Sequence, residues 1–438
     1  MSRIFYIIFI IIILSGCSLK KDSKFWPTSK KIYQDGDINQ KENKIELVFN
    51  EEQVLNKEFN ESLEIKINKN DNKTAIPYYH SNNNGSLNFD GDLKNISRYK
   101  FSKIKNFYQY EPAILFIKNN LIFFENKGSL LKFNENSKLI WKKNYYSKSE
   151  KKLNPIIQFS NNNKFLIAAD NLAKYYMLDI ETGDLIWSKN NLAPFNSQIK
   201  IYKDKFFIVD FSNTLRCFSL KDGTELWNVK TQNSLIRSQK KLSIVIVKDK
   251  IFFNNSIGDI SAVDLNKGEL LWQLPTQSSL IYESAFSLKN SEMITDNAAL
   301  FFSNNKNKFF SIDIDTGSFN WEAEINSYLR PTLVGDTLFT ISLEGYLFVI
   351  DKYSGNILRV TDIFKTFKKN RNLIKPSGFI LGSQKIYLST NNGRLLTIDI
   401  NTGKTISVLK IDNEKILRPF INNQNLFTVK DNAIIKLN

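Results

Sequence analysis

Histidine and cysteine are nearly absent from this sequence of 438 residues. The one histidine, His80, lies in an asparagine-rich stretch, and the two cysteines, Cys17 and Cys217, are far apart. A Ser-His-Asp or Cys-His catalytic arrangement is therefore excluded from the rest of the chain. The motif G-x-S-x-G and a complete phosphate-binding loop are missing as well. Cys217 falls on an expected strand, and we interpret it as a small apolar core residue without a function.

Long apolar runs are missing too, except at the N-terminus. The run Ile4–Leu14 contains eleven apolar residues, which is too short for a bilayer span of about 20 residues but fits a secretory signal. Its end, Leu14–Cys17, resembles the lipobox of bacterial lipoproteins, which implies removal of residues 1–16 and acylation of Cys17, for example with palmitate. Ser18 follows where an aspartate favours the inner membrane, so we expect the outer membrane. The alternative is a short buried helix with an isolated cysteine.

Acidic residues are too few to balance the basic ones, and the formal net charge is +16. A charge of this size can attract anionic partners. The lysines, however, are spread along the whole chain together with abundant asparagine and isoleucine. We therefore interpret the charge as a compositional bias and expect no nucleic acid partner.

The composition divides the chain into four regions. Residues 1–16 are the expected lipoprotein signal peptide, and 17–67 are a lipid-anchored polar tether with a short N-terminal segment. Residues 68–95 are an irregular, asparagine-rich lead-in. Residues 96–438 hold an internal repeat.

The repeat is a ten-residue pattern that ends a strand, turns on a glycine and starts a new strand. It recurs roughly every 44 residues, a period typical of propeller blades. The seven copies are KFNENSKLIW (132–141), LDIETGDLIW (178–187), FSLKDGTELW (218–227), VDLNKGELLW (263–272), IDIDTGSFNW (312–321), IDKYSGNILR (350–359) and IDINTGKTIS (398–407). The turn position holds Ser137 in the first copy and then Gly183, Gly223, Gly268, Gly317, Gly355 and Gly403.

Each copy predicts a β-hairpin, because glycine adopts positive φ without steric cost. Two further short apolar runs precede each hairpin, so that one unit becomes a four-stranded antiparallel blade. An eighth unit begins at Pro419 and supplies three strands. Pairing these with a strand in Ile96–Ile104 closes the ring and removes its open edges. The sequence thus predicts an all-β, eight-bladed β-propeller, with seven blades as the alternative.

Five of the six tryptophans stand four residues after the turn position. We expect each to pack against the next blade while its indole N–H finds a backbone acceptor. An aromatic ligand site is the other interpretation, but a ligand seldom needs the same residue at five places around a ring. The five are Trp141, Trp187, Trp227, Trp272 and Trp321.

The D-x-x-T-G turn with its trailing tryptophan resembles the pyrroloquinoline-quinone (PQQ) type of propeller repeat. One function that this resemblance implies is a PQQ-dependent dehydrogenase. Such enzymes hold a quinone and calcium, and many carry a vicinal cysteine pair that is missing here. We expect no cofactor, no metal site and no enzymatic activity.

The lipobox, tether and propeller together resemble the lipoprotein B (BamB) family of the outer-membrane β-barrel assembly machinery. The resemblance implies a non-catalytic scaffold on the periplasmic side of the outer membrane of a Gram-negative bacterium. It binds the POTRA domains of the barrel-inserting subunit and aids insertion of outer-membrane proteins, with unfolded clients as possible further partners. Another envelope propeller that binds a different protein remains an alternative.

The family's contact segment follows the third complete unit. At the matching place this sequence has NSLIRSQ, so the resemblance implies that Leu235, Ile236 and Arg237 contact the partner. The alternative is that these residues start a strand. The family also carries acidic residues after the fourth unit, where this sequence offers Glu283.

Overall fold

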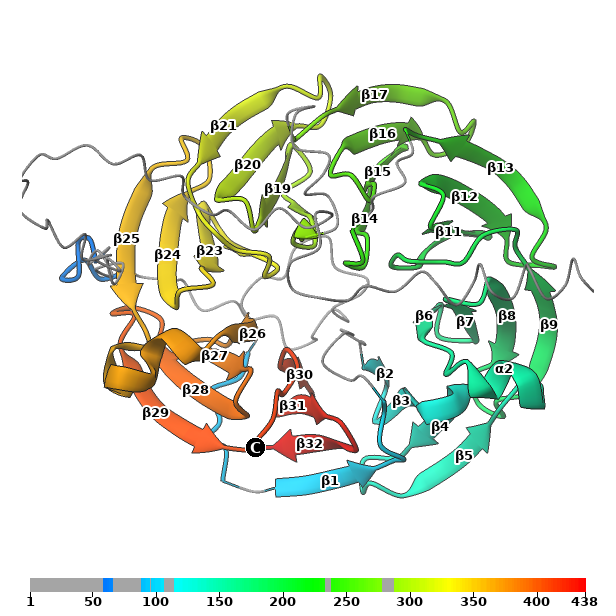
Figure 1. The fold of residues 1–438 in the computed structure, drawn as a ribbon, viewed down its shortest axis with the longest axis horizontal. Helices are drawn as coiled ribbons and strands as arrows, with labels where there is room; N and C mark the ends of the chain where they lie inside the picture. Colours follow the sequence, from blue (N-terminus) through cyan, green and yellow to red (C-terminus); the bar gives the residue numbers. More distant parts are fainter. Residues whose placement is uncertain (1–57, 66–87, 95, 106–113, 233–237, 278–286) are drawn as a thin grey trace, which may run out of the picture. The chain divides into compact units, whose positions relative to one another are not determined.

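A computed structural model describes residues 58–65, 88–94, 96–105, 114–232, 238–277 and 287–438. All of them belong to one unit, Asn56–Asn438. Eight four-stranded sheets form the blades of a β-propeller (Figure 1). The predicted all-β, eight-bladed architecture is confirmed, and the alternative of seven blades is wrong.

The chain builds the first seven blades in sequence order. Blade 1 comprises β2 (Leu115–Ile117), β3 (Asn120–Glu125), β4 (Ser129–Phe133) and β5 (Leu139–Lys143). Blade 2 comprises β6 (Ile157–Asn161), β7 (Phe165–Asp170), β8 (Lys174–Asp179) and β9 (Leu185–Asn190). Blade 3 comprises β10 (Lys200–Tyr202), β11 (Lys205–Val209), β12 (Thr214–Ser219) and β13 (Glu225–Lys230). Blade 4 comprises β14 (Ile244–Val247), β15 (Lys250–Asn254), β16 (Ile260–Asp264) and β17 (Leu270–Leu274).

The remaining blades follow the same plan. Blade 5 comprises β18 (Ile294–Thr295), β19 (Ala299–Asn304), β20 (Lys308–Asp313) and β21 (Phe319–Ala323). Blade 6 comprises β22 (Thr332–Val334), β23 (Thr337–Ile341), β24 (Tyr346–Asp351) and β25 (Ile357–Asp362). Blade 7 comprises β26 (Pro376–Leu381), β27 (Lys385–Thr390), β28 (Arg394–Asp399) and β29 (Thr405–Lys410). Blade 8 comprises β1 (Ile96–Lys100), β30 (Phe420–Asn422), β31 (Asn425–Lys430) and β32 (Ala433–Leu437).

Helices are short in the part of the chain that the structure describes. They are η2 (Asn126–Gly128), α2 (Lys148–Lys152) and η4 (Lys365–Leu373). None of the described helices has the length and apolar character needed to cross a bilayer.

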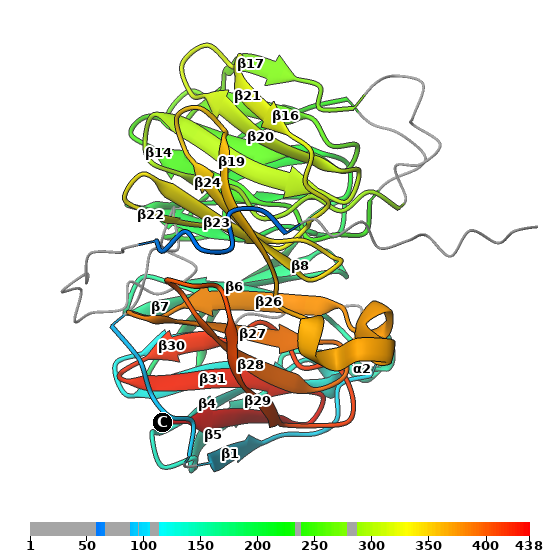
Figure 2. The same cartoon turned by 90° about the vertical axis from the view of Figure 1, so that its left-hand side faces the viewer.

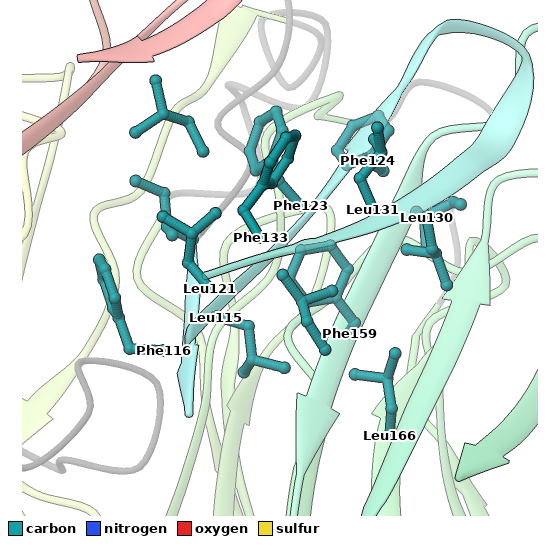
Figure 3. Packing of buried hydrophobic residues seen from close by; sticks show 14 of the residues in the cluster. Leu115, Phe116, Leu121, Phe123, Phe124, Leu130, Leu131, Phe133, Phe159 and Leu166 are labelled. Carbon is teal, nitrogen blue, oxygen red and sulfur yellow. The ribbon is translucent and has the colours of Figure 1, made fainter. Parts of the chain in front are cut away.

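The core lies between neighbouring blades. In blades 1 to 7 the first strand is nearest the centre and the fourth lies at the rim, whereas in blade 8 β30 is nearest the centre and β1 lies at the rim (Figure 1). The middle strands are apolar on both faces, because each blade is covered by a neighbour on either side. Between blades 1 and 2, for example, the ring centroids of Phe124 and Phe159 are 6.4 Å apart, and Leu166 lies beside them (Figure 3).

Blade 8 closes the ring with strands from both ends of the repeat region. β1 pairs antiparallel with β32, from Ser97 opposite Lys436 to Lys100 opposite Ala433. The predicted closure, one N-terminal strand with three C-terminal strands, is therefore confirmed. The Lys94 N–H also donates to the carbonyl of Asn438 (3.0 Å), so residues 88–94 take the place of the hairpin that other blades have here.

The repeated glycines have positive φ, between 69° and 75° in the six hairpins. They also allow a close approach that the sequence does not reveal. A Cβ added to Gly268 would lie 2.6 Å from Cδ2 of Trp227, and one added to Gly317 would lie 2.6 Å from Cδ2 of Trp272. The tryptophan of one blade therefore covers the hairpin glycine of the next, at Gly183, Gly223, Gly268, Gly317 and Gly355.

The indole N–H groups cross the same seams. Trp187 donates to the carbonyl of Leu220 (3.1 Å), Trp272 to that of Ile314 (3.2 Å) and Trp321 to that of Lys352 (2.9 Å). The packing interpretation of the tryptophans thus agrees with the geometry at these seams. The indole nitrogens of Trp141 and Trp227 are buried without an acceptor among the described residues.

The remaining seams use other side chains. Tyr99 of β1 is buried and its hydroxyl donates to the carbonyl of Glu135 (3.1 Å), so it closes the seam between blades 8 and 1. Arg359 stands at the tryptophan position of blade 6, and its guanidinium lies against Gly403. At these seven seams, a rim side chain of one blade contacts the hairpin of the next.

A comparison of two glycine substitutions tests the close approach across a seam. Gly268 and Gly335 both have positive φ, 72° and 59°, so alanine at either position costs about 1–2 kcal/mol of backbone strain. Only at Gly268 does the new Cβ meet a ring, since nothing lies within 4 Å of a Cβ at Gly335. We expect Gly268→Ala to lower the free energy of urea unfolding by about 1–3 kcal/mol more than Gly335→Ala does. Equal losses would show that the ring contact contributes nothing.

Candidate functional site

The predicted partner residues lie outside the described part of the chain. Cys17 precedes it, Leu235, Ile236 and Arg237 fall in residues 233–237, and Glu283 falls in residues 278–286. Their roles stay predictions. We call 233–237 and 278–286 the predicted contact segments, and the structure describes the residues on both sides of each.

The start of the first segment is held by the turn between β11 and β12. The side-chain amide of Asn213 donates to the carbonyl of Gln232 (2.9 Å), and the hydroxyl of Thr231 donates to the carbonyl of Asn213 (3.0 Å). The same Asn213 accepts from the N–H of Ser256 in blade 4 (3.0 Å). The chain thus enters the segment from a position fixed by two blades.

The residues that follow the two segments contact one another. The hydroxyl of Ser238, directly after the first segment, donates to the carbonyl of Leu288 (2.5 Å), which lies just after the second. Both residues are buried, and the N–H of Ser238 also donates to the carbonyl of Ser256 (2.9 Å). Thr276, before the second segment, donates to the carbonyl of Gly258 (2.7 Å). The structure therefore brings together the flanks of two segments that the sequence separates.

The described flanks of the contact segments and the repeated hairpins lie at opposite ends of the blade strands. The hairpin joins β12 to β13 at one end of the strands, whereas residues 231–243 join β13 to β14 at the other end. All blades have the same antiparallel order, so the same holds for the connection that contains residues 278–286. A partner on the contact segments therefore meets the face without D-x-x-T-G turns.

Basic side chains surround these flanks. The ammonium groups of Lys240 and Lys289 lie 5.0 and 5.1 Å from the ring centroid of Tyr328, which is favourable cation–π geometry. Glu292 accepts from Arg330 (3.1 Å) and lies 3.4 Å from the ammonium of Lys241. We call Lys200, Lys240, Lys241, Lys289 and Arg330 the basic cluster.

Lys200, the first residue of β10, is the most deeply buried lysine of the basic cluster. Burial, and next the positive charge of Arg330, lower the pKa of Lys200 to about 7. The nearby Glu292 opposes this effect without cancelling it. Burial is the main cause of this lowered pKa, and the neighbouring positive charges add to it.

The side chains near the contact segments are suited to binding another molecule. Among the residues that the structure describes, no group of three or more His, Cys, Asp or Glu side chains is placed to hold a metal ion. Cys217 is buried in the core, and burial raises the pKa of its thiol to about 12. Of the basic cluster, Lys289 is exposed and Lys240 is partly exposed, and their ammonium groups fit carboxylates.

The basic cluster was not predicted from the sequence. Its members come from the connections before β10, β14, β18 and β22, and nothing in the spacing of single lysines in a lysine-rich chain singles them out. Arg359 differs, because its departure from the tryptophan pattern is visible in the sixth copy of the repeat.

Solved structures with the same fold serve different functions. BamB from Moraxella catarrhalis superposes with a TM-score of 0.62 and 15% identity, over 78% of this chain and 100% of that one. Quinohemoprotein alcohol dehydrogenase from Comamonas testosteroni gives a TM-score of 0.60 and 8% identity, over 84% and 81%. At such identities the likeness shows the fold alone. No curated protein sequence matches the chain significantly.

The blades and their repeats define an eight-bladed β-propeller of the PQQ-like class. Residues 126–361, more than half of the chain, match the family described as "Outer membrane protein assembly factor BamB". The chain belongs to this family, and its resemblance to lipoprotein B is confirmed at that level.

Replacing Lys200 by methionine tests the electrostatics of the cluster. The pKa of Lys200 is lower in the folded chain, about 7, than in the unfolded chain, about 10.4. Between these values the unfolded state binds more protons, so the lysine costs the fold most below pH 7 and progressively less as the pH rises toward 10. We expect the unfolding free energy of the unaltered chain to gain on that of Lys200→Met from pH 7 to pH 10 in urea titrations. A difference that stays flat, as expected for the exposed control Lys221→Met, would contradict this.

Proposed function

We propose that this chain is a non-catalytic scaffold lipoprotein of the β-barrel assembly machinery. It is held on the periplasmic side of the outer membrane by a lipid on Cys17. It binds the periplasmic POTRA domains of the barrel-inserting subunit through the predicted contact segments and so aids the insertion of outer-membrane proteins. Membership of the BamB family, with a match over residues 126–361, is the observation that carries this proposal.

The arrangement around the contact segments supports a protein-binding role. The hydrogen bond from Ser238 to Leu288 brings the flanks of the two segments together, so one partner can reach both. Flanks held in place by hydrogen bonds lower the conformational entropy that is lost on binding. Leu235 and Ile236 then supply the apolar anchor, and Arg237 a carboxylate or carbonyl contact.

The charge around this surface defines the partner further. The basic cluster lies beside the flanks, with Lys289 directly after Leu288. Complementary charge raises the association rate and excludes wrong partners. The face of the POTRA domains that docks here is therefore acidic, and the affinity falls as the salt concentration rises.

Substitution of Arg237 tests the partner contact. Arg237→Glu reverses the charge at the centre of the predicted surface, so binding to the purified POTRA domains should weaken at least about 10-fold, or about 1.4 kcal/mol. The melting temperature should not change, because Arg237 belongs to none of the seven repeat copies in the sequence. Isothermal titration calorimetry measures the affinity. Lys221→Glu makes the same charge change on the exposed hairpin of blade 3 and should leave it unaltered. If Arg237→Glu binds as well as the unaltered chain, the contact assignment is wrong.

Substitution of Cys17 tests the membrane anchor. Cys17→Ser removes the thiol that lipidation requires, so metabolic labelling with palmitate should disappear. The chain should move from the outer-membrane fraction to the soluble periplasmic fraction, while Cys217→Ser, at the buried cysteine, should keep both label and location. Unchanged labelling in Cys17→Ser would rule out this anchor.

A further inference from the structure

The rim of blade 6 departs from the other rims because Arg359 replaces the tryptophan there. Its side chain is fully buried. The guanidinium donates to the carbonyls of Leu63 (3.0 Å) and Ile400 (3.1 Å) and also to that of Asn401. It thus joins the hairpin of blade 7 to a segment that precedes the propeller by sequence.

That segment, residues 58–65, lies along the outer edge of β25 (Figures 1 and 2). Phe59 and Val360 exchange two backbone hydrogen bonds, of 3.0 and 2.9 Å, in antiparallel pairing. The side-chain amide of Asn60 donates to the carbonyl of Leu358 (3.1 Å), and the N–H of Ile65 donates to the carbonyl of Asn401 (3.1 Å). The segment therefore adds itself to the blade as a short fifth strand.

Charge fixes the other end of the segment. Glu58 lies 2.9 Å from the ammonium of Lys365 and accepts from the N–H of Asp362 (3.3 Å). Its side chain is only 5% exposed, although Lys365 itself is 66% exposed. A carboxylate at this position is thus recognised by a backbone donor and a lysine together.

Side-chain burial in the segment is uneven. Phe59 is 51% exposed and Leu63 is 39% exposed, whereas Ile65 packs partly buried against the core cluster of blades 6 and 7. Backbone bonds, the contacts of Arg359 and one ion pair thus hold a segment whose largest apolar side chain is half in solvent. Nε of Arg359 is buried without an acceptor among the described residues, so the segment leaves one donor of the site unsatisfied. An occupant that buried its apolar side chains and reached this donor would bind more tightly.

We propose that the outer edge of blade 6 is a binding site for an extended segment of another polypeptide, which residues 58–65 occupy as an internal ligand. The ligand is a strand with a carboxylate at the position of Glu58, a free backbone opposite Val360 and a carbonyl that receives Arg359. Such strand addition takes its affinity from the main chain and its specificity from the side-chain contacts. The proposal is independent of the contact segments and of the partner proposed above.

A labelled peptide tests the site on the full-length chain. The probe is a fluorescein-labelled peptide with the sequence of residues 57–66, KEFNESLEIK. In the chain variant Phe59→Pro the internal ligand lacks the N–H that bonds Val360, so the site is open. We expect the peptide to bind this variant with micromolar affinity and the unaltered chain at least about 10-fold more weakly, because a tethered segment competes at an effective concentration near millimolar. Fluorescence anisotropy gives both affinities.

Two controls separate this site from weaker explanations. A peptide with proline at the position of Phe59 should not bind the open variant, and the double variant with Val360→Pro should not bind the original peptide. Proline is tolerated at position 360 because the N–H of Val360 points away from β24 and bonds only Phe59 of the segment. Equal binding of both peptides, or equal affinity of the open and unaltered chains, would overturn the proposal. A further result would overturn it as well. If the unaltered chain dimerised in sedimentation experiments and the peptide no longer bound, the occupant of the site would be a second copy of the chain.

Discussion

The close approach of a rim side chain to a glycine backbone holds neighbouring blades together. The strand ladders of each blade are confined to that blade, so few backbone hydrogen bonds join one sheet to the next. At five seams a tryptophan covers the next hairpin glycine, and at a sixth Arg359 takes this part against Gly403. The contact needs a residue without Cβ on one side and a large planar group on the other. The glycine is therefore the more constrained of the two positions, since Arg359 replaces the tryptophan while Gly403 keeps the glycine.

Much of the fold was predictable because it is local and repeated. The turn position of each copy, with a glycine in six of the seven and a trailing tryptophan in five, places the third and fourth strands. The incomplete unit after Pro419 indicates the closing strand near Ile96. The sequence did not reveal which residues of different blades contact one another. Nothing in the pattern says that Gly268 faces Trp227, since the two lie on different blades. The β-bulge opposite each tryptophan, as between Cys217 and Phe218, was equally invisible, because it depends on the register of two strands.

The candidate site was predictable only in part, and for the same reason. The resemblance indicated the contact segments, but their joined flanks depend on one hydrogen bond between Ser238 and Leu288. The basic cluster gathers lysines from four blades in a chain where lysine is common everywhere. From the composition we interpreted the positive charge as a bias without a function, and for most of the surface this interpretation is unchanged. At Lys200 the structure concentrates the charge and thereby gives it a local consequence.

The pairing of β1 with β32 affects how the chain folds during synthesis. Ser97 and Lys436 lie opposite one another, although most of the chain is synthesised between them. Among the described strands β32 is the partner of β1, so β1 leaves the ribosome long before that partner exists and stays an unpaired edge until then. Such an edge invites pairing with other nascent chains. Delayed closure makes the pairing of the last strands the step that separates a folded ring from an aggregation-prone open edge. During the long interval before it, a chaperone can bind the exposed edge.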